Sequence, residues 1–486
     1  MILSKLVLLK YQFVISSLDP VEVYMLGIEI NRQSEVSLKR QIYHKLRDYI
    51  LDGRIAAGEP LPSTRELAKD LAVSRNTICE AYDMLLAEGF VLSSQGAPTR
   101  VAEGLSIPKE SSEEFLQKES QSYDNIKADF RTGQPDLRYF PRYMWNRILY
   151  KAMDEMPLYQ FGYSGPDGLT QLREEISGWL FRSRGIKVDP CDIFITVGAT
   201  YGLHLISGML YEEGKEILME DPCHMGMLRA LRNKGYPVCP VPVDEHGMII
   251  EHLDGKAAWA IYVTPSHQFP LGGILPAGRR AGLIRFAREN GIYIIEDDYD
   301  SEFRYCGEPI APLYSMDPQR VIYVGTFSKV LFPALRIGYV LLPRQLHKKW
   351  RYLRTHTDVQ NPPFEQAALA EFLRSRKIDR HVLKMKRLYG ERRKALLLAL
   401  AEQFGNTWHS WGDATGLHIA VEFPGMQFGY EFLHKCKTNG IILKSVEYHS
   451  ICKGKHLDKL LLGYGHMEID EINKGISVLN KFITSI

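Results

Sequence analysis

Apolar residues in the first hundred positions recur at helical spacing in three stretches. The first has a single stripe that stops at Gly53 and consists of Ile42, Leu46, Tyr49 and Ile50. Ser63 and Glu66 form a capping box at the start of the second, whose apolar face is Leu67, Ala68 and Leu71. Ser74 is an N-cap for the third, which runs to Gly89. A longer helix followed by two short helices with a tight turn between them predicts a helix-turn-helix.

The pattern changes twice after these helices. Phe90–Ser93 and Thr99–Val101 are strand-like around the turn residues 95–98, which predicts a hairpin, or wing. Residues 104–125 are polar without a clear period and predict a linker. From about Ala128, strand-like runs alternate with helical patterns, which is typical of βαβ units and a mostly parallel sheet. The clearest of these runs are Ile193–Val197, Ala258–Val263, Ile292–Ile295 and Val321–Val324.

These patterns predict a multidomain chain. We expect a small all-α winged helix-turn-helix and a large α/β domain with a C-terminal α+β small subdomain. The expected boundaries are an unstructured N-terminal extension over 1–34, the helix-turn-helix unit over 35–103, a linker over 104–126 and the α/β domain over 127–486. A chain of 486 residues is long enough for two or three domains.

The N-terminal extension is fairly apolar over Met1–Ser17, which suggests a signal or anchor at first sight. Lys5 and Lys10 interrupt it, and no small-residue cleavage pattern follows. A membrane span needs roughly 20 apolar residues without such interruptions. We therefore expect neither a signal peptide nor a membrane anchor. An over-long start, with Met25 as the initiator, is an alternative.

Charge and cysteine content restrict the partners and the compartment. The net charge is +2, and residues 37–103 hold nine Lys/Arg and nine Asp/Glu, so any DNA-facing surface must come from the placement of charges. The seven cysteines are scattered and include no CxxC pair. Their pattern argues against a disulfide framework or a zinc site and favours a reducing compartment. We expect a cytoplasmic protein without a metal site.

The helix-turn-helix region closely resembles the GntR family of winged-helix regulators. The resemblance lies in Leu61-Pro-Ser-Thr-Arg-Glu-Leu-Ala, Val73-Ser-Arg-Asn-Thr-Ile and Ala81-Tyr-Asp-Met-Leu-Leu-Ala-Glu-Gly-Phe. It implies a double-stranded DNA operator as partner, with the second helix of the pair in the major groove. Arginine and asparagine can each bond a base bidentately, so the base-facing positions would be Ser74, Arg75, Asn76 and Thr77.

Two further positions of this region would contact the DNA backbone. Arg65 begins the preceding helix, where a phosphate contact is expected. Gly96 would let the wing tip approach the backbone closely, although Ala97-Pro98 replaces part of the family's usual Gly-rich wing. The alternative for Arg65 and Arg75 is that both are solvated charges at helix ends.

The second half of the chain contains residues suited to a phosphorylated cofactor. Lys329 ends the segment Gly325-Thr-Phe-Ser-Lys after a strand, a setting in which a lysine can form a Schiff base. Thr326, Ser328 and Arg336 could hold a phosphate dianion. Small residues over 198–202 could expose backbone N–H groups for the same phosphate, although a plain strand–helix turn is the alternative.

Two more segments fit the same chemistry. Asp297 and Tyr299 follow a strand, and ligands of open α/β sheets bind at the carboxyl ends of strands. A carboxylate there could keep a pyridinium nitrogen protonated, and Tyr299 could bond a phenolic oxygen. The run Thr264-Pro-Ser-His-Gln-Phe-Pro-Leu-Gly predicts a turn after another strand.

From about residue 129 onwards, these segments resemble fold-type I pyridoxal-phosphate proteins of the aminotransferase class. By position, the resemblance makes Lys329 the lysine that attaches pyridoxal 5′-phosphate and Asp297 the partner of its pyridine nitrogen. The phosphate cup that it implies is Gly198, Ala199, Thr200, Thr326, Ser328 and Arg336. Tyr163, in Tyr163-Ser-Gly-Pro-Asp-Gly, matches a residue that reaches the phosphate of the other subunit. The resemblance therefore implies a head-to-tail homodimer.

A GntR-type module joined to such a domain resembles the MocR family, also called GabR-like regulators. Three positions depart from the related enzymes. His224 stands where a tyrosine usually stacks on the cofactor ring, and an imidazole can also stack, so we expect His224 to contact the cofactor. Phe269 replaces an asparagine found in many aminotransferases. Leu461 falls where the family usually has an arginine for the substrate carboxylate.

The sequence therefore predicts a cofactor-dependent transcription regulator that senses an amine, an amino acid or pyridoxal phosphate itself. An aminotransferase with a DNA-binding appendage is the main alternative, and a residual transaminase half-reaction stays open. A DNA-binding protein with an inert C-terminal domain is a third possibility. Asp297 and Lys329 argue against the inert domain, and Leu461 argues against the enzyme.

Overall fold

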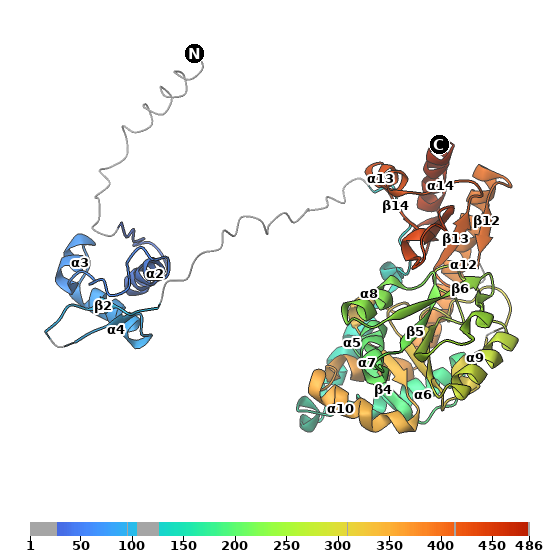
Figure 1. Ribbon diagram of the computed structural model, residues 1–486, viewed down its shortest axis with the longest axis horizontal. Helices are drawn as coiled ribbons and strands as arrows, with labels where there is room; N and C mark the ends of the chain where they lie inside the picture. Colours follow the sequence, from blue (N-terminus) through green and yellow to red (C-terminus); the bar gives the residue numbers. More distant parts are fainter. Residues whose placement is uncertain (1–26, 95, 105–125, 309, 413–414, 485–486) are drawn as a thin grey trace, which may run out of the picture. The chain divides into compact units, whose positions relative to one another are not determined.

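The computed structural model describes residues 27–94, 96–104, 126–308, 310–412 and 415–484. The chain divides into two compact units, Met1–Gln121 and Ser122–Ile486 (Figure 1), and each is described by itself. Residues 1–26 and 105–125, on which most of the expected extension and linker fall, lie outside the described residues. Among the described helices, none combines the length and apolar character that a membrane crossing requires.

The N-terminal unit is a winged helix-turn-helix. Its elements are α2 (Leu38–Leu51), α3 (Thr64–Asp70), α4 (Arg75–Ala87) and the antiparallel strands β1 (Val91–Leu92) and β2 (Arg100–Val101). The caps expected at Ser63 and Ser74 are present, and Glu66 completes the capping box. Ile28 is fully buried in the core of this unit. The packed unit therefore begins before residue 35, because the chain ahead of α2 contributes an apolar side chain to the core.

The C-terminal unit is built on an eight-stranded mixed sheet. Along the sheet the order is β4 (Ile193–Thr196), β11 (Gly338–Leu341), β10 (Val321–Thr326), β9 (Tyr293–Asp298), β8 (Ala258–Val263), β5 (Glu216–Asp221), β6 (Val238–Asp244) and β7 (Gly247–Met248). Strands β10, β9, β8, β5 and β6 are parallel, whereas β11 is antiparallel to both neighbours and β7 to β6. The four strands expected from the sequence are β4, β8, β9 and β10.

Helices cover both faces of this sheet, because its strands are apolar on both sides. One buried cluster joins one set of strand residues to α5 (Arg142–Asp154), α6 (Thr170–Arg184), α9 (Ala277–Glu289) and α11 (Pro363–Arg374). A second cluster joins the alternate residues to α7 (Ala199–Leu210), α8 (Met225–Asn233) and α10 (His347–Thr357). The result is the three-layer α/β architecture that the alternating pattern predicted.

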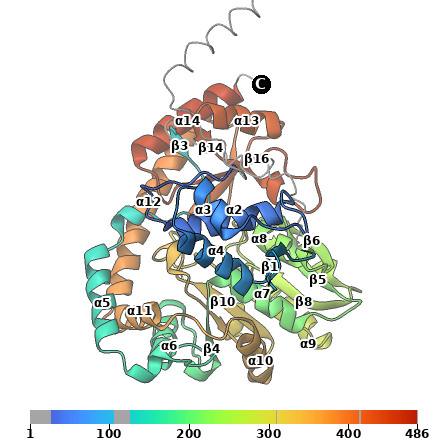
Figure 2. The same ribbon diagram turned by 90° about the vertical axis from the view of Figure 1, so that its left-hand side faces the viewer.

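A small α+β subdomain completes the unit. Its sheet has the order β12 (His409–Trp411), β13 (His418–Glu422), β16 (Lys459–Gly463) and β15 (Lys444–Ser445). Helices α12 (Lys377–Phe404), α13 (Tyr430–Thr438) and α14 (Ile469–Ile483) accompany it, and Figure 2 shows α13, α14 and β16 gathered near the C-terminus. The first strand of the unit, β3 (Ala128–Asp129), pairs with β14 (Ile441–Ile442) of this subdomain.

Candidate functional site

The parallel strands β8, β9 and β10 end at the same edge of the sheet, and a cavity of about 260 Å³ opens there. Its lining consists of Thr132, Gly133, Ala199, Thr200, Leu203, His224, Tyr262, Thr264, Phe269, Asp297, Tyr299, Thr326, Ser328, Lys329, Pro333, Arg336 and His418. The structure thus brings together nine of the eleven residues expected at the cofactor. The exceptions are Gly198, which directly precedes the lining residue Ala199, and Tyr163, whose side chain is outside this cavity and 89% exposed.

Lys329 follows β10 and places its amine inside the cavity. Its Nζ donates a hydrogen bond of 2.6 Å to the carbonyl oxygen of Gly133. Burial lowers the pKa of Lys329, while the carboxylates of Asp300 and Asp297 act in the opposite direction. A lowered pKa increases the fraction of neutral amine, which is the nucleophilic form. The position and the electrostatics of Lys329 therefore suit attack on a carbonyl carbon.

Replacing Gly133 with alanine should weaken cofactor binding. Gly133 has φ +69°, and a Cβ at this position would lie 2.7 Å from Lys329 Nζ. A left-handed backbone conformation costs alanine about 1–2 kcal/mol relative to glycine. The added methyl group would also displace the amine of Lys329. We expect cofactor affinity to fall at least about tenfold, which corresponds to about 1.4 kcal/mol. Absorbance titration of the apoprotein with pyridoxal phosphate measures this.

Gly185→Ala is the matched control for this substitution. Gly185 ends α6 with φ +67°, but no atom lies within 4 Å of the added Cβ. It should lower the free energy of unfolding by a similar amount and leave the affinity unchanged. Equal cofactor affinity in the two variants would show that the contact between Gly133 and Lys329 is irrelevant to binding.

Asp297 offers an unused acceptor deep in the cavity. The hydroxyl of Tyr262 donates to Asp297 Oδ2 at 2.7 Å, while Oδ1 is buried without a hydrogen-bond partner among the described residues. Burial raises the pKa of Asp297 to about 6, against the hydrogen bond from Tyr262. A buried carboxylate with a free oxygen is costly unless a donor or a cation completes it. A protonated ring nitrogen is such a group, so this position fits pyridoxal phosphate.

The other end of the cavity offers donors for a phosphate. Helix α7 begins at Ala199, and its first N–H groups have no acceptor within the helix. Gly198 precedes it with φ +78°, and a Cβ there would lie 3.1 Å from the guanidinium of Arg336. The Thr326 hydroxyl donates to Ser328 Oγ at 3.0 Å. Backbone amides, two hydroxyls and one guanidinium are a suitable donor set for a dianion.

Imidazole and aromatic rings line the remaining wall. His224 caps α8, and its Nδ1 accepts the Met227 N–H at 3.3 Å. The ring of Phe269 lies edge-to-face with that of His224, at 5.7 Å between centroids, and also contacts His418. Burial lowers the pKa of both His224 and His418 to about 4. Both imidazoles are therefore neutral at pH 7, and they offer hydrogen bonds rather than positive charge.

Leu461, which the resemblance matches to a carboxylate-binding arginine, does not line the described cavity. Leu461 is fully buried on β16 in an apolar cluster with Leu271, Ala420 and Val446. Lys459, two residues earlier, lies 3.3 Å from Glu422 and 2.8 Å from Asp458 and does not line the cavity. Among the described lining residues, the only lysine is Lys329 and the only arginine is Arg336.

The residues expected to contact DNA lie on the surface of the N-terminal unit. Arg65, Ser74, Arg75, Asn76 and Gly96 are exposed and Thr77 is half-buried. The Ser74 hydroxyl is engaged by Thr77, accepting its N–H at 3.1 Å and bonding its hydroxyl at 2.8 Å. Arg75 Nε donates to Thr64 at 3.2 Å, and its terminal nitrogens have no hydrogen-bond partner among the described residues. Arg75 and Asn76 are therefore the freest donors at the start of α4.

Comparison with known proteins matches both units. Residues 38–101 match the gntR family of bacterial regulatory proteins, and residues 151–427 match aminotransferase class I and II. An archaeal alanine:glyoxylate aminotransferase superimposes with a TM-score of 0.69 and 26% identity, covering 74% of this chain and 91% of its own. The fold and the pocket define a winged helix-turn-helix regulator joined to an aminotransferase-like domain.

Relatives place the chain within this class. The probable rhizopine catabolism regulatory protein MocR of Rhizobium meliloti is 34% identical, covering 81% of this chain and 83% of its own length. The pyridoxine biosynthesis transcriptional regulator PdxR of Corynebacterium glutamicum is also 34% identical, over 76% and 80%. The regulator YdeL of Bacillus subtilis is 32% identical over 93% and 97%. The chain belongs to the MocR-like family of helix-turn-helix transcriptional regulators, which confirms the resemblance seen in the sequence.

Several lining residues were not anticipated from the sequence. Tyr262 lies within strand β8, where it resembles any other buried apolar position. Thr132 and Gly133 precede the sheet by more than fifty residues, and His418 belongs to the small subdomain. Thr264 and Phe269, in contrast, lie in the segment after β8 that the sequence analysis had singled out.

Proposed function

We propose that this regulator binds pyridoxal 5′-phosphate in the described cavity and that the state of this cavity controls operator binding. When bound, the cofactor supplies an electrophilic carbon that reacts with primary amines. Lys329 would attach it, Asp297 would hold a proton at the ring nitrogen, and Tyr299 would donate to the phenolic oxygen. His224 would lie against the ring, and the phosphate would be held by Ala199, Thr200, Thr326, Ser328 and Arg336.

The observation that carries this proposal is the juxtaposition of three groups in one cavity: the amine of Lys329, the unpartnered Oδ1 of Asp297 and the donor set around Arg336. Each group has another explanation alone, but a nucleophilic amine, a buried acceptor and an anion site together match one ligand. We further infer a head-to-tail homodimer, in which the exposed Tyr163 would reach the partner's phosphate site, and a cytoplasmic location where operator DNA is accessible.

The sensing role is favoured over transamination by the wall opposite the phosphate. A transaminase grips the α-carboxylate of its substrate with a guanidinium, and the sequence resemblance matches Leu461 to that arginine. Among the described residues that line the cavity, the only guanidinium is that of Arg336, which belongs to the expected phosphate site. Neutral His224 and His418 do not replace the lost charge. The effector is therefore expected to be pyridoxal phosphate itself or an amine that does not depend on a carboxylate contact.

Common α-amino acids should be turned over far more slowly than about 1 per second, a modest enzymatic rate. The reason is the missing carboxylate contact, whose loss commonly costs a few kcal/mol when the carboxylate is desolvated. Holoprotein should be titrated with amino acids, amines and free cofactor while the visible spectrum and operator affinity are followed together. Matched pairs such as phenylalanine and phenylethylamine isolate the carboxylate.

Rapid conversion of an ordinary α-amino acid to its keto acid would support the alternative, an aminotransferase with a DNA-binding appendage. A protein that neither takes up pyridoxal phosphate nor changes its operator affinity in response to it would contradict the proposed sensing role.

A further inference from the structure

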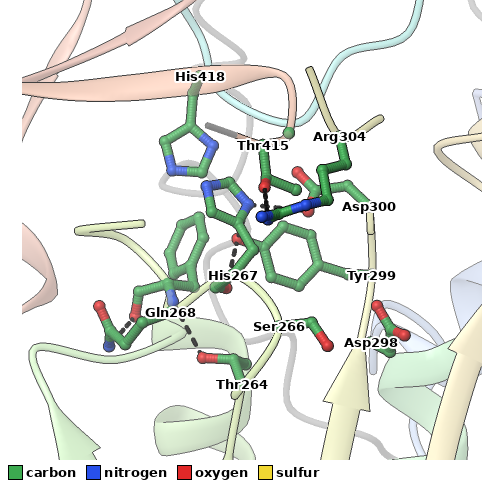
Figure 3. Close-up of polar contacts among 12 residues, drawn as sticks. Thr264, Ser266, His267, Gln268, Asp298, Tyr299, Asp300, Arg304, Thr415 and His418 are labelled. Atoms are coloured by element: carbon green, nitrogen blue, oxygen red, sulfur yellow. Dashed lines mark hydrogen bonds and ion pairs between the residues drawn. The ribbon is translucent and has the colours of Figure 1, made fainter. Parts of the chain in front are cut away.

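The hydroxyl of Tyr299 is held from behind by a buried imidazole. Tyr299 Oη lies 2.9 Å from His267 Nδ1 and donates to the His267 carbonyl oxygen at 3.1 Å. The two rings are stacked, with centroids 5.6 Å apart (Figure 3). His267 is only 2% exposed. Its position therefore decides where the Tyr299 hydroxyl lies.

His267 is in turn held by Asp300. The Nδ1 atom of His267 lies 2.8 Å from Asp300 Oδ1, and Asp300 is 2% exposed. An ionised carboxylate can only accept, so the shared proton belongs on Nδ1. The same N–H can also be shared with the oxygen of Tyr299, which fixes the place of that oxygen. The phenolic hydrogen, which the His267 carbonyl accepts in this structure, can then turn to a stronger acceptor in the cavity.

The backbone of Gly416 closes the outer side of this pair. Gly416 has φ +85°, and a Cβ there would collide with the His267 ring and with Asp300 Oδ2. Its amide donates to the Phe303 carbonyl at 2.8 Å, and its own carbonyl accepts the hydroxyls of Tyr305 and Tyr464. The close packing shields the hydrogen bonds between Asp300 and His267 from water, which strengthens them.

The same packing argues against a cation at this place. Ligand atoms of His267, Asp300 and His418 lie within 4.8 Å of one another, which is compatible with a metal site. However, His267 and Asp300 are already joined at hydrogen-bond distance, and His418 Nε2 donates to the Pro270 carbonyl at 3.1 Å. Gly416 packs directly against both His267 and Asp300, so that even a Cβ has no room there. The arrangement is that of a hydrogen-bonded chain.

Several charged or titratable groups surround this chain. The neighbours that act on Tyr299 or His418 are Glu220 on β5, Asp297 and Asp298 on β9, Lys329 after β10, and Asp300 and His267 themselves. Burial, followed by the carboxylate of Asp300, raises the pKa of Tyr299 well above its usual value. Tyr299 therefore keeps its proton over the accessible pH range and can serve as a donor throughout.

We propose that His267 and Asp300 are positioning residues that aim the Tyr299 hydroxyl at the phenolic oxygen of the cofactor and so set the pH at which the bound cofactor changes its absorption. This inference rests on the proposed cofactor binding. A donor at the phenolic oxygen stabilises its negative charge and hence the deprotonated form of the chromophore. Weakening that donor should raise the midpoint of the spectral pH titration.

The test is the spectral titration of holoprotein carrying His267→Phe, with Tyr299→Phe and the double variant alongside. We expect His267→Phe to raise the midpoint by about one pH unit, a typical effect of one lost hydrogen bond on a pKa. In the Tyr299→Phe background the same substitution should have almost no effect, because His267 acts through Tyr299. In His267→Asn the side-chain amide can occupy the place of Nδ1. The midpoint of this variant should therefore lie between those of wild type and His267→Phe.

Asp300→Asn keeps the shape of the pair and removes its charge, so it replaces His267→Phe in the test if that variant fails to fold. We expect it to raise the midpoint of the titration less than His267→Phe does. His449→Phe is the matched control, because His449 is also buried beside Phe269 but bonds the Cys223 carbonyl instead of Tyr299. An unchanged midpoint in both His267→Phe and Asp300→Asn, or equal shifts with and without Tyr299, would overturn the inference. A wild-type protein with no cofactor absorption would instead contradict the proposed function.

Discussion

Lys329→Ala should eliminate the covalent attachment of pyridoxal phosphate. Lys329 is the only lysine among the described residues that line the cavity. Its Nζ is held by a hydrogen bond of 2.6 Å to the carbonyl oxygen of Gly133. Borohydride reduction of the wild-type holoprotein, followed by peptide mapping, should place the cofactor on Lys329. In the variant no peptide should carry it, although the phosphate donors can still retain some cofactor reversibly.

Lys459→Met is the control for this experiment. Lys459 is a suitable comparison because it is also a buried lysine of this unit. It is paired with Glu422 and Asp458, however, and does not line the cavity. The variant should lose some stability and keep full labelling at Lys329. Labelling of any other lysine in wild-type protein, or a colourless protein that takes up no cofactor, would contradict the assignment.

Arg75→Ala should weaken operator binding by about 1–3 kcal/mol, or roughly 5- to 150-fold, if Arg75 reads a base edge. Arg75 is the first residue of α4 and is exposed, and within the described part of the chain only its Nε is engaged, by Thr64. The loss should be confined to the specific site and should leave binding to unrelated DNA nearly unchanged. Fluorescence anisotropy with an operator selected from random DNA measures both.

Two further variants separate base reading from phosphate contact. Arg65→Ala should weaken all DNA sequences alike and reduce the salt dependence of binding by about one ion. Arg47→Ala is the control, since Arg47 is paired with its neighbour Asp48 on α2 and is not expected to contact DNA. Wild-type operator affinity in both Arg75→Ala and Arg65→Ala would show that another surface of the unit binds DNA.

Short-range patterns were sufficient to predict the helix-turn-helix. The capping box of Ser63 and Glu66, and the cap at Ser74, depend on residues three positions apart, so the sequence alone places them. The chain ahead of α2 was missed, because Ile28 is buried by contacts with a folded core, and the alternation Ile28-Glu29-Ile30 is too short to predict an element. The positions of β4, β8, β9 and β10 could likewise be predicted, since strands of a sheet covered on both faces are continuous apolar runs.

The sequence by itself also determined which reactive and charged side chains line the pocket. Asp297, Tyr299, Lys329 and Arg336 lie in short motifs at strand ends, and parallel strands bring such ends to one edge. Only the tertiary structure decided what surrounds them. Gly133 meets Lys329 across 196 positions of sequence, and His418 enters from the small subdomain. These contacts depend on how separate elements pack, and a local pattern contains no record of a partner that folding brings from elsewhere.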